Sequence, residues 1–340
     1  MNDTKHLLVT GGLGFIGSNF IRHILNKYKD YKITNLDKQT YAGNPQNLND
    51  IEKNPRYTFI KGDICNKSVV EKAIKGANII INFAAESHVD RSIGDPDAFI
   101  RTDIFGTYTL LEAAKAHNVK FIQISTDEVY GSIEKGAFKE IDKLHPSSPY
   151  SASKASAEML VLSYHTTYNL PIIITRSSNN FGPFHYPEKI IPLFITNLLE
   201  NKKVPIYGDG KNVRDWLYVL DNIEAIDFLL HNGKVGEIYN IGADNEKTNL
   251  EITKLMLKEL GKDESSIEFV KDRPGHDRRY ALDSTKLHKL GWKPRHKFEQ
   301  ALKDTIDWYK NNEKWWRPLK SGEYLKYYSE LYKKQHGMKS

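Results

Sequence analysis

A glycine-rich turn near the start of the chain constrains its fold more than any other feature. Residues 6–10 form a short apolar run, and residues 10–17 then read TGGLGFIG, with glycines at Gly11, Gly14 and Gly17. Glycines at this spacing, after a strand and before a helix, allow a tight turn, close approach of the backbone to a pyrophosphate and close packing of helix on strand. The helix N-terminus then presents N–H groups to the phosphates. The turn therefore predicts a βαβ unit that binds a dinucleotide.

Short β-branched runs and longer helical patterns alternate through the first half of the chain. Candidate strands are residues 6–10, 32–37, 57–61, 78–83, 120–125 and 171–175, and candidate helices are residues 15–29, 67–76, 97–117 and 149–168. The helical segments have apolar residues three or four positions apart. This alternation predicts a parallel sheet covered on both faces, which is the doubly wound, Rossmann-like α/β class.

The alternation stops after about residue 176. Gly and Pro punctuate the chain at 182–183, 187, 208–210 and 273–275, and helical patterns return at 189–200, 221–231, 250–260 and 298–310. Long loops of this kind commonly line a cleft. We therefore predict an NAD-binding Rossmann domain over residues 1–176, to which later segments return, a smaller mixed α/β domain for the substrate over 177–330, and a basic tail over 331–340.

Charge is unevenly distributed along the chain. The formal net charge is +6, but residues 310–340 hold eight basic and three acidic residues, whereas the other 309 residues hold 41 basic and 40 acidic ones. The body of the chain therefore has no electrostatic footprint for nucleic acid, and we expect no nucleic-acid partner. The C-terminal segment is also rich in Tyr and Trp, which predicts a terminal helix with a basic outer face.

Cysteine usage and hydropathy limit the compartment and the metal chemistry. Cys65 is the only cysteine, so an intrachain disulfide or a Cys-cluster zinc site cannot form, and we predict no metal. The apolar run in the first ten residues is too short for a signal peptide, and no stretch approaches the ~18 apolar residues of a membrane span. We expect a cytoplasmic protein with no membrane partner.

The second candidate strand ends at Asp37, twenty residues after Gly17. A carboxylate there accepts hydrogen bonds from both ribose hydroxyls and repels a 2′-phosphate. No Arg lies beside it, although Lys38 follows directly, so NAD is favoured over NADP. Asp63 and Ile64, at the end of the third strand, are candidates for the adenine site, although Asp63 is equally consistent with a turn.

A set of polar residues ends the fifth strand and opens the helix near residue 150. Thr126 ends the strand, and Tyr150 and Lys154 lie four residues apart, so both side chains can address the same ligand. An ammonium group near a phenol favours phenolate, which lowers the tyrosine pKa and makes it a usable base. Tyr-x-x-x-Lys is common by chance, but after a dinucleotide loop and a strand-end threonine it predicts a catalytic pair.

With these motifs in place, the chain resembles the extended short-chain dehydrogenase/reductase family over nearly its whole length. The adjacent carboxyls of Asp127 and Glu128 are the discriminating feature, because oxidation of a carbinol needs only the Tyr/Lys/Thr set. An additional proton donor and acceptor is what elimination of water requires, whereas an acidic loop facing solvent is the structural alternative. Six further segments closely resemble the nucleotide-sugar dehydratases of that family: residues 84–92, 179–183, 187–189, 205–208, 214–216 and 272–276.

The resemblance implies NAD as cofactor and a nucleotide sugar, dTDP-glucose, as substrate. It places NAD beside Phe15, Ile16, Asp37, Lys38, Gln39, Thr40, Asp63, Ile64, Ala84, Ala85, Glu86, Ser87, Thr102, Tyr150, Lys154 and Asn180. It places the nucleotide sugar beside Ser87, Thr126, Asn179, Glu188, Lys189, Pro205, Ile206, Tyr207, Arg214, Asn249, Asp272, Arg273, Pro274, Gly275 and His276. Arg214, Arg273 and Lys189 offer cationic donors for a pyrophosphate, although each taken alone reads as a solvated surface charge. Tyr207 and Trp216 are more often packing residues than stacking platforms.

The activity that the resemblance implies is a dehydration with no net redox change. Tyr150 takes the proton of the sugar 4-hydroxyl while C4 gives hydride to NAD, and Thr126 hydrogen-bonds the same oxygen. Glu128 then removes the C5 proton, and Asp127 donates a proton to the departing 6-hydroxyl. Hydride returns to C6 and C5 is reprotonated, which gives a 4-keto-6-deoxy sugar. Two neighbouring acids in a low-dielectric site do not both ionise easily, but their division of roles rests on the resemblance alone.

Two other functions stay open from the sequence. A UDP-sugar 4-epimerase shares the glycine turn, Tyr150 and Lys154, but has no need for the acid pair. A non-catalytic NAD-binding regulator would leave those two residues and Thr126 without a purpose. Helices such as 97–117 and 149–168 commonly build a dimer seam in this family, so the resemblance also implies a homodimer. The choice between a thymine and a uracil nucleotide is not decided.

Overall fold

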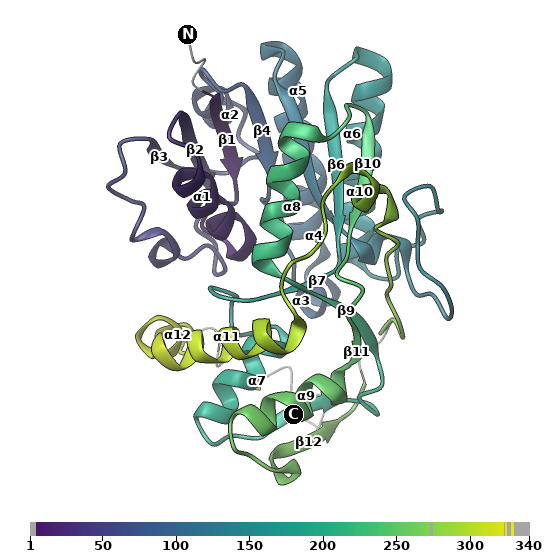
Figure 1. Cartoon of the computed structure of the whole chain (residues 1–340). Helices are drawn as coiled ribbons and strands as arrows, with labels where there is room; N and C mark the ends of the chain where they lie inside the picture. Colours follow the sequence, from purple (N-terminus) through teal and green to yellow (C-terminus); the bar gives the residue numbers. More distant parts are fainter. Residues whose placement is uncertain (1–4, 273–274, 323, 325–327, 330–340) are drawn as a thin grey trace.

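A sheet of seven parallel strands lies at the centre of this computed structural model (Figure 1). The structure describes every residue except 1–4, 273–274, 323, 325–327 and 330–340. Over the described residues, the strand order is β10-β6-β5-β4-β1-β2-β3, and each neighbouring pair is parallel. The strands are β1 Lys5–Thr10, β2 Tyr31–Asp37, β3 Tyr57–Lys61, β4 Ile79–Asn82, β5 Lys120–Thr126, β6 Ile172–Ser177 and β10 Glu237–Ile241. The predicted doubly wound α/β fold is therefore confirmed.

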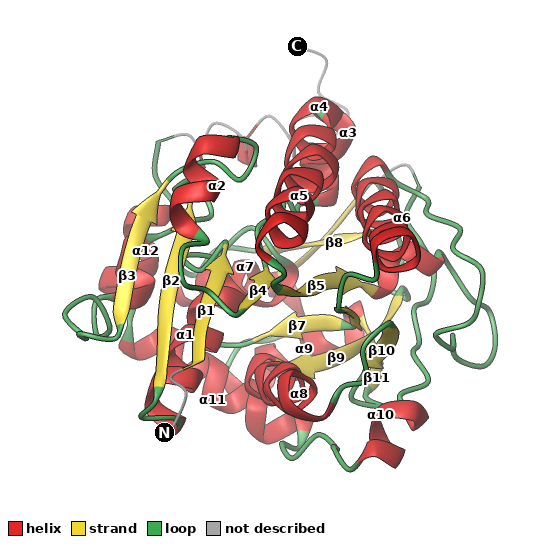
Figure 2. Ribbon diagram, turned by 90° about the horizontal axis from the view of Figure 1, so that it is seen from above, coloured by secondary structure: helices red, strands yellow, loops and turns green. Residues whose placement is uncertain are grey.

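Helices cover both faces of this sheet (Figure 2). One face carries α1 Phe15–Lys27, α8 Val219–Asn232 and α10 Thr285–Leu290, and the other carries α2 Lys67–Ala73, α5 Thr107–His117 and α6 Pro149–Tyr168. Successive side chains of a strand point to opposite faces, so Leu7 and Val9 pack with the first group of helices and Leu8 packs with the second. Burial on both faces is the reason that these strands are continuous apolar runs.

The order in which strands are added to the sheet reverses between β1 and β4. Strands β2 and β3 extend from one side of β1, whereas β4, β5 and β6 extend from the other. Such a reversal opens a crevice at the carboxyl ends of the two strands, where doubly wound folds bind ligands. Gly11 has a φ of +68°, and a Cβ there would lie 2.6 Å from the amide nitrogen of Ala84. A Cβ on Gly17 would lie 2.5 Å from the Gly11 carbonyl oxygen, so both positions require glycine.

The second half of the chain forms a smaller unit below the central sheet in Figure 1. It contains a three-stranded sheet of β7 Asn179–Phe181, β9 Val213–Tyr218 and β11 Glu246–Thr248, and a two-stranded sheet of β8 Val204–Tyr207 and β12 Ile267–Val270. Its helices are α7 Ile190–Leu199, α9 Asn249–Glu259, α11 Phe298–Asn311 and α12 Glu313–Leu319. Strand β10 and helices α8 and α10 return to the central sheet, and the division of domains at residue 176 stays a prediction.

The helix predicted over residues 97–117 is confirmed as one continuous helical run, which begins at Pro96 and changes its hydrogen-bond pattern along its length. After the short helix α3 Val89–Gly94, α4 Pro96–Phe99 leads into a π-helical turn, Ile100–Gly106, and then into α5. A Cβ on Gly106 would lie 2.4 Å from Ile64 Cδ1, so glycine allows the turn to pack closely there. π-Helical turns occur often at functional sites. This one places Thr102 on the wall of the main cavity and buries Asp103.

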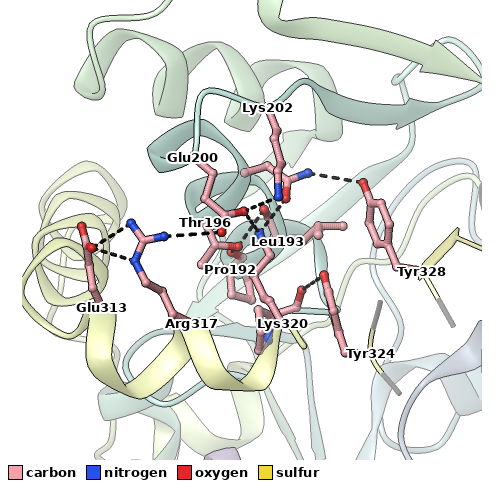
Figure 3. Close-up of polar contacts among 12 residues, drawn as sticks. Pro192, Leu193, Thr196, Glu200, Lys202, Glu313, Arg317, Lys320, Tyr324 and Tyr328 are labelled. Carbon is pink, nitrogen blue, oxygen red and sulfur yellow. Dashed lines mark hydrogen bonds and ion pairs between the residues drawn. The ribbon is translucent and has the colours of Figure 1, made fainter. Parts of the chain in front are cut away.

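The C-terminal segment packs against the smaller unit. Helix α12 buries Trp315 and Trp316, and Lys320 just after it is only 7% exposed. The Lys320 ammonium lies 2.9 Å from Asn197 Oδ1 and 2.7 Å from Glu200 Oε2 (Figure 3). The expectation of a basic outer face is therefore wrong for Lys320, because a carboxylate on the smaller unit pairs with it. The predicted basic tail, residues 331–340, lies outside the described residues.

A buried ion pair fastens α6 to the sheet. Arg176 on β6 and Glu158 on α6 are almost fully buried, and Arg176 Nη2 lies 2.5 Å from Glu158 Oε2. The Ser125 hydroxyl, near the end of β5, also donates to Glu158. Arg176 donates in turn to the Tyr130 hydroxyl at 2.7 Å. One carboxylate thus joins α6 to two neighbouring strands.

We expect Glu158→Gln to lower the free energy of unfolding by about 3–5 kcal/mol, because it leaves the buried Arg176 guanidinium without a counter-charge. Urea unfolding followed by tryptophan fluorescence measures this loss. The control is Glu264→Gln, which breaks the exposed pair with Lys254 at 2.9 Å and should cost less than about 1 kcal/mol. Equal losses in the two variants would contradict a special role for the buried pair.

Candidate active site

The main cavity lies at the carboxyl ends of the central strands. Its walls include every predicted cofactor residue except Gln39, namely Gly11, Gly14, Phe15, Ile16, Gly17, Asp37, Lys38, Thr40, Asp63, Ile64, Ala84, Ala85, Glu86, Ser87, Thr102, Tyr150, Lys154 and Asn180. Gln39 has a φ of +58° and its N–H donates to Asp37 Oδ1 at 2.8 Å, so it shapes the turn after β2. The structure therefore brings together at one site residues from the ends of β1, β2, β3 and β4, with others from the π-helical turn, α6 and β7.

The two acidic residues at the far end of this cavity have different partners. Asp37 accepts hydrogen bonds from the backbone N–H groups of Leu13 and Gln39, which oppose the rise in its pKa caused by burial. Asp63 Oδ2 lies 2.7 Å from Lys38 Nζ. Burial alone would raise the pKa of Asp63, but the hydrogen bond from Lys38 keeps that pKa below its ordinary value. Because Lys38 is paired with Asp63, the surroundings of Asp37 suit a ribose diol better than a 2′-phosphate.

A dinucleotide fits the residues that line this cavity. The glycine turn lets a ligand approach the start of α1 closely, and the N-cap residue of this helix is Gly14. In the described part of the chain, Asn180 Oδ1 and His185 Nδ1 are buried on the cavity wall with no hydrogen-bond partner. Buried polar atoms normally have partners, so polar groups of a ligand are a physical explanation for both.

The acid pair lies on a 3₁₀ turn, Asp127–Tyr130, directly after β5. Thr126 Oγ1 donates to Asp127 Oδ1 at 3.2 Å and accepts from the Glu128 N–H at 3.3 Å, which caps the turn. Asp127 is 2% exposed. Burial first, and the neighbouring Glu128 second, raise the pKa of Asp127 well above its ordinary value, against an opposing effect of Arg214. An acidic loop facing solvent is therefore wrong for Asp127, which is suited to hold a proton near neutral pH.

Tyr150 and Lys154 face the same cavity, but their electrostatics differ from the sequence-based expectation. Burial and the nearby carboxyls of Glu128 and Asp103 raise the pKa of Tyr150 well above its ordinary value, and the hydrogen bond with Thr126 opposes this only in part. Lys154 is buried, which lowers its pKa, and its ammonium donates to the Ile124 carbonyl at 2.8 Å. The expected lowering of the Tyr150 pKa is therefore wrong for the protein alone. Additional positive charge in the cavity would be needed to lower this pKa.

Sequence reasoning missed several residues that shape the site. Asp103 is fully buried on the π-helical turn and accepts hydrogen bonds from the Glu86 N–H at 3.0 Å and the Ser153 hydroxyl at 2.6 Å. Burial raises the pKa of Asp103 to about 6, and burial together with Asp103 raises the pKa of Glu86 to about 7. Asp103 has no motif in the sequence. Glu158 could have been found, because Tyr150, Lys154 and Glu158 repeat every four residues along one helix face.

The predicted substrate residues divide between two adjoining cavities. Ser87, Thr126, Asn179, Glu188 and Lys189 line the main cavity. A smaller cavity has walls that include Pro205, Ile206, Tyr207 and Asn249. Glu188 and Ile190 line both, so the two cavities meet at these residues. Trp216 also lines the main cavity, and its indole N–H donates to the Lys247 carbonyl at 3.2 Å.

The remaining predicted substrate residues are not on the described walls of either cavity. Arg214 is buried, donates to the carbonyls of Val213 and Asp277, and lies 4.3 Å from the ring centre of Tyr280. The ring of His276 is edge-on to Tyr207 at 5.9 Å, so His276 lies beside the smaller cavity, and its Nδ1 lies 2.6 Å from Asp272 Oδ1. Gly275, directly before His276, has a φ of +64°. Arg273 and Pro274 lie outside the described residues. Of the three expected cleft cations, the structure places only Lys189 on a cavity wall, over the residues it describes.

The fold and the site together define an extended short-chain dehydrogenase/reductase. Residues 8–305 match the family described as GDP-mannose 4,6 dehydratase. The chain is 48% identical to a dTDP-glucose 4,6-dehydratase from Streptomyces niveus, over 93% of this chain and 96% of that protein. It is 47% identical to dTDP-glucose 4,6-dehydratase 1 from Escherichia coli strain K12, over 96% of this chain and 98% of that protein. The chain belongs to the dTDP-glucose 4,6-dehydratase family.

Solved structures show the same likeness. A dTDP-glucose 4,6-dehydratase from Bacillus anthracis in complex with NAD is 52% identical, with a TM-score of 0.87, and the match covers 93% of this chain and 99% of that one. A UDP-glucuronic acid 4-epimerase from Bacillus cereus is 31% identical, with a TM-score of 0.85, over 90% and 99% of the two chains. This epimerase therefore shares the fold at lower identity. Because the fold is common to both activities, only the residues of the site can distinguish a dehydratase from an epimerase.

No helix in the described ranges is long and apolar enough to cross a membrane. The same residues hold no group of three or more His, Cys, Asp or Glu side chains arranged to bind a metal ion.

We expect Asp127→Asn to make the protein more stable, and increasingly so as the pH rises. The unfolded-state pKa of an aspartate is about 3.9, whereas burial raises the folded-state pKa of Asp127. Between these two values the folded state keeps a proton that the unfolded state loses, so each pH unit costs at most about 1.4 kcal/mol of stability, and asparagine removes that cost. Thermal unfolding between pH 5 and 8 measures the difference.

The matched control for this prediction is Asp263→Asn. Asp263 is exposed and its pKa is lowered by hydrogen bonds from Ser265, so the stability that it gives is present above the unfolded-state pKa and is lost only as the pH falls. Its variant should therefore show a constant difference from the parent above about pH 5. A flat difference for Asp127→Asn as well would mean that Asp127 is ionised in the folded protein.

Proposed function

We propose that this protein converts dTDP-glucose to dTDP-4-keto-6-deoxyglucose and water, as a hydro-lyase with tightly bound NAD. The observation that carries the proposal is the buried Asp127 next to Glu128, on a turn that also faces Tyr150 and Thr126. Oxidation and reduction at one carbon would not need this acid pair, whereas loss of water needs both a proton donor and a proton acceptor. The relatives named dTDP-glucose 4,6-dehydratases and their solved structures with NAD support the same activity.

The cofactor would lie along the main cavity between the glycine turn and the acid pair. Gly11, Gly14 and Gly17 would receive the pyrophosphate, and Asp37 would accept from the ribose hydroxyls. When bound, NAD supplies a hydride acceptor that takes hydride from C4 of the sugar and later returns it to C6. Asn180 and Thr102 line the stretch of wall between these two ends.

Tyr150 and Thr126 act on the 4-hydroxyl of the sugar. Thr126 hydrogen-bonds the oxygen, and Tyr150 accepts its proton as the C4 ketone forms. Burial raises the pKa of Tyr150, so the phenol becomes a usable base only when positive charge near it increases. Lys154, held 2.8 Å from the Ile124 carbonyl, contributes part of that charge.

Glu128 and Asp127 then carry out the elimination. The C4 ketone acidifies the neighbouring C5–H bond, and Glu128 takes this proton. The electron pair forms the C5–C6 double bond as the C6–O bond breaks, and protonated Asp127 donates to the departing hydroxyl so that water leaves. The difference in burial between the two carboxyls supports this division, because a general acid needs the higher pKa.

We expect Asp127→Asn and Glu128→Gln each to slow product release by roughly 10²–10⁴-fold, since each removes one proton-transfer group. Hydride transfer from C4 should continue, so reduced cofactor should build up on both variants after dTDP-glucose is added. Absorbance of the bound cofactor in stopped flow measures the build-up, and mass spectrometry measures the product. Release of product at the parent rate by both variants would contradict the assignment.

A UDP-sugar 4-epimerase activity is the second candidate, because an epimerase of known structure shares the fold. Incubation of the parent protein with dTDP-glucose separates the possibilities. Loss of one water from the substrate mass supports dehydration. An unchanged mass with inverted C4 supports epimerisation, and unreacted substrate supports a regulator that only binds NAD.

We also propose a homodimer and a cytoplasmic location. Half-exposed apolar side chains gather on one side of the molecule, along α3, the π-helical turn, α5 and α6: Ile93, Ile100, Phe105, Tyr108, Met159 and Tyr168. Contiguous exposed apolar surface commonly marks an interface. Because the chain has a single cysteine, its fold does not depend on an intrachain disulfide, and it is compatible with the reducing cytoplasm.

We expect the double variant Ile100→Asp and Phe105→Asp to convert a dimer into a monomer, because it places two charges in the apolar surface. Light scattering after size-exclusion chromatography measures the mass. The control is Ile141→Asp, at a position that is 90% exposed on a loop. A parent protein that is already monomeric, or a double variant that stays dimeric, would contradict this interface.

A further inference from the structure

The smaller cavity has walls from five separate parts of the chain. Strand β8 contributes Pro205 to Tyr207, and Asn249 comes from the start of α9. The other lining residues are His88, Asp90, Glu188, Ile190, Leu193 and Phe194, together with Tyr324 and Tyr328 from the C-terminal segment. The rings of these two tyrosines stack on each other with centres 5.9 Å apart and planes 22° apart. Tyr324 follows Tyr150 by 174 residues in the sequence, and the C-terminal segment nevertheless reaches the substrate side of the molecule.

The position of this cavity suggests which part of the substrate it receives. The sugar has to reach the acid pair in the main cavity, and the smaller cavity joins the main one at Glu188 and Ile190. The nucleotide end therefore extends into the smaller cavity. Aromatic and aliphatic side chains make most of its wall, with His88, Asp90, Glu188 and Asn249 as the polar groups, and this combination suits a flat base with polar edges.

The same segment also holds the loop between the two cavities. The Tyr324 hydroxyl donates to the Pro187 carbonyl at 2.9 Å, the Tyr309 hydroxyl donates to the His185 carbonyl, and the Tyr186 hydroxyl donates to the Leu319 carbonyl at 3.4 Å. Residues 185–189 are thus tied to the C-terminal segment at three points. At one end of this loop His185 stacks on Phe15 of the glycine turn at 4.0 Å, and at the other end lie Glu188 and Lys189.

A buried lysine anchors this segment on α7 (Figure 3). Lys320 Nζ reaches Asn197 and Glu200, which lie at the end of α7, and Arg317 lies 3.7 Å from the same Glu200. Asn197 Nδ2 donates in turn to the Tyr328 hydroxyl at 3.3 Å. Because a buried ammonium is stable only when it is paired, this anchor fixes where Tyr324 and Tyr328 lie.

We propose that Tyr324, with Tyr328 beside it, is a nucleotide-binding and positioning residue of the substrate site. Its ring forms a wall for the base end of the nucleotide. Its hydroxyl holds the Pro187 carbonyl, so that Glu188 and Lys189 face the substrate. Lys320 acts through this tyrosine as a positioning residue. The inference rests on the proposed function, since it takes dTDP-glucose as the ligand.

Three variants test the proposal in the full-length protein with its cofactor. Tyr324→Phe removes only the hydroxyl and should raise the KM for dTDP-glucose about three- to tenfold, the effect of one hydrogen bond, with kcat changed less than twofold. Tyr324→Ala also removes the ring and should raise the KM further, by about tenfold or more. Lys320→Met should raise the KM in the same direction. Calorimetric titration with dTDP should show the same loss of affinity, with the NAD content unchanged.

The control is Tyr31→Phe, which removes a buried tyrosine hydroxyl that contacts His231 at 2.7 Å. It should change neither KM nor dTDP affinity. If Tyr324→Phe and Tyr324→Ala both keep the parent KM and dTDP affinity, or if they lower kcat alone, the inference is wrong while the dehydratase activity stands. If the parent protein neither binds dTDP nor converts dTDP-glucose, the proposed function fails first.

Discussion

The buried pair of Glu158 and Arg176 is the interaction on which the catalytic geometry depends. Glu158 continues the helix face of Tyr150 and Lys154, and it also accepts from Ser125, the residue before Thr126. Arg176 holds the hydroxyl of Tyr130, the last residue of the turn that carries the acid pair. Residues from β5, β6, α6 and the 3₁₀ turn therefore share one buried charge network, and breaking it would disturb the base and the acid pair together.

Burial gives different pKa values to side chains that would have similar pKa values in water. Asp127 and Glu128 are neighbours with similar side chains, yet Asp127 is almost completely buried, which raises its pKa, whereas Glu128 is only partly buried. The same burial raises the pKa of Tyr150 and lowers that of Lys154, so the site favours neutral groups until a charged ligand enters. Burying these ionisable groups lowers the free energy of unfolding, and it also shifts their pKa values in the way that proton transfer at an active site requires.

The smaller unit does more than close the cleft. Its C-terminal segment ties down residues 185–189, and this loop contacts the glycine turn through His185 and the nucleotide-sugar side through Glu188. The proposed cofactor and substrate sites are therefore neighbours along one short loop. The basic residues of the C-terminal segment, which first suggested an outward-facing surface, include Lys320, whose buried ammonium pairs with the partly buried Glu200.

The sequence by itself determined the doubly wound sheet, because strand-helix alternation and the glycine turn depend on local periodicity and on backbone space that only glycine provides. It also determined which residues end the strands, and hence most of the main cavity wall. The resemblance supplied the division of roles between Asp127 and Glu128, and only the tertiary structure gave it a physical basis, since burial depends on distant segments. Spacing gave no sign of Asp103, of the π-helical turn or of the return of Tyr324 to residues 185–189. Contacts between residues 17 to 137 positions apart in the sequence set these features, and no local pattern records them.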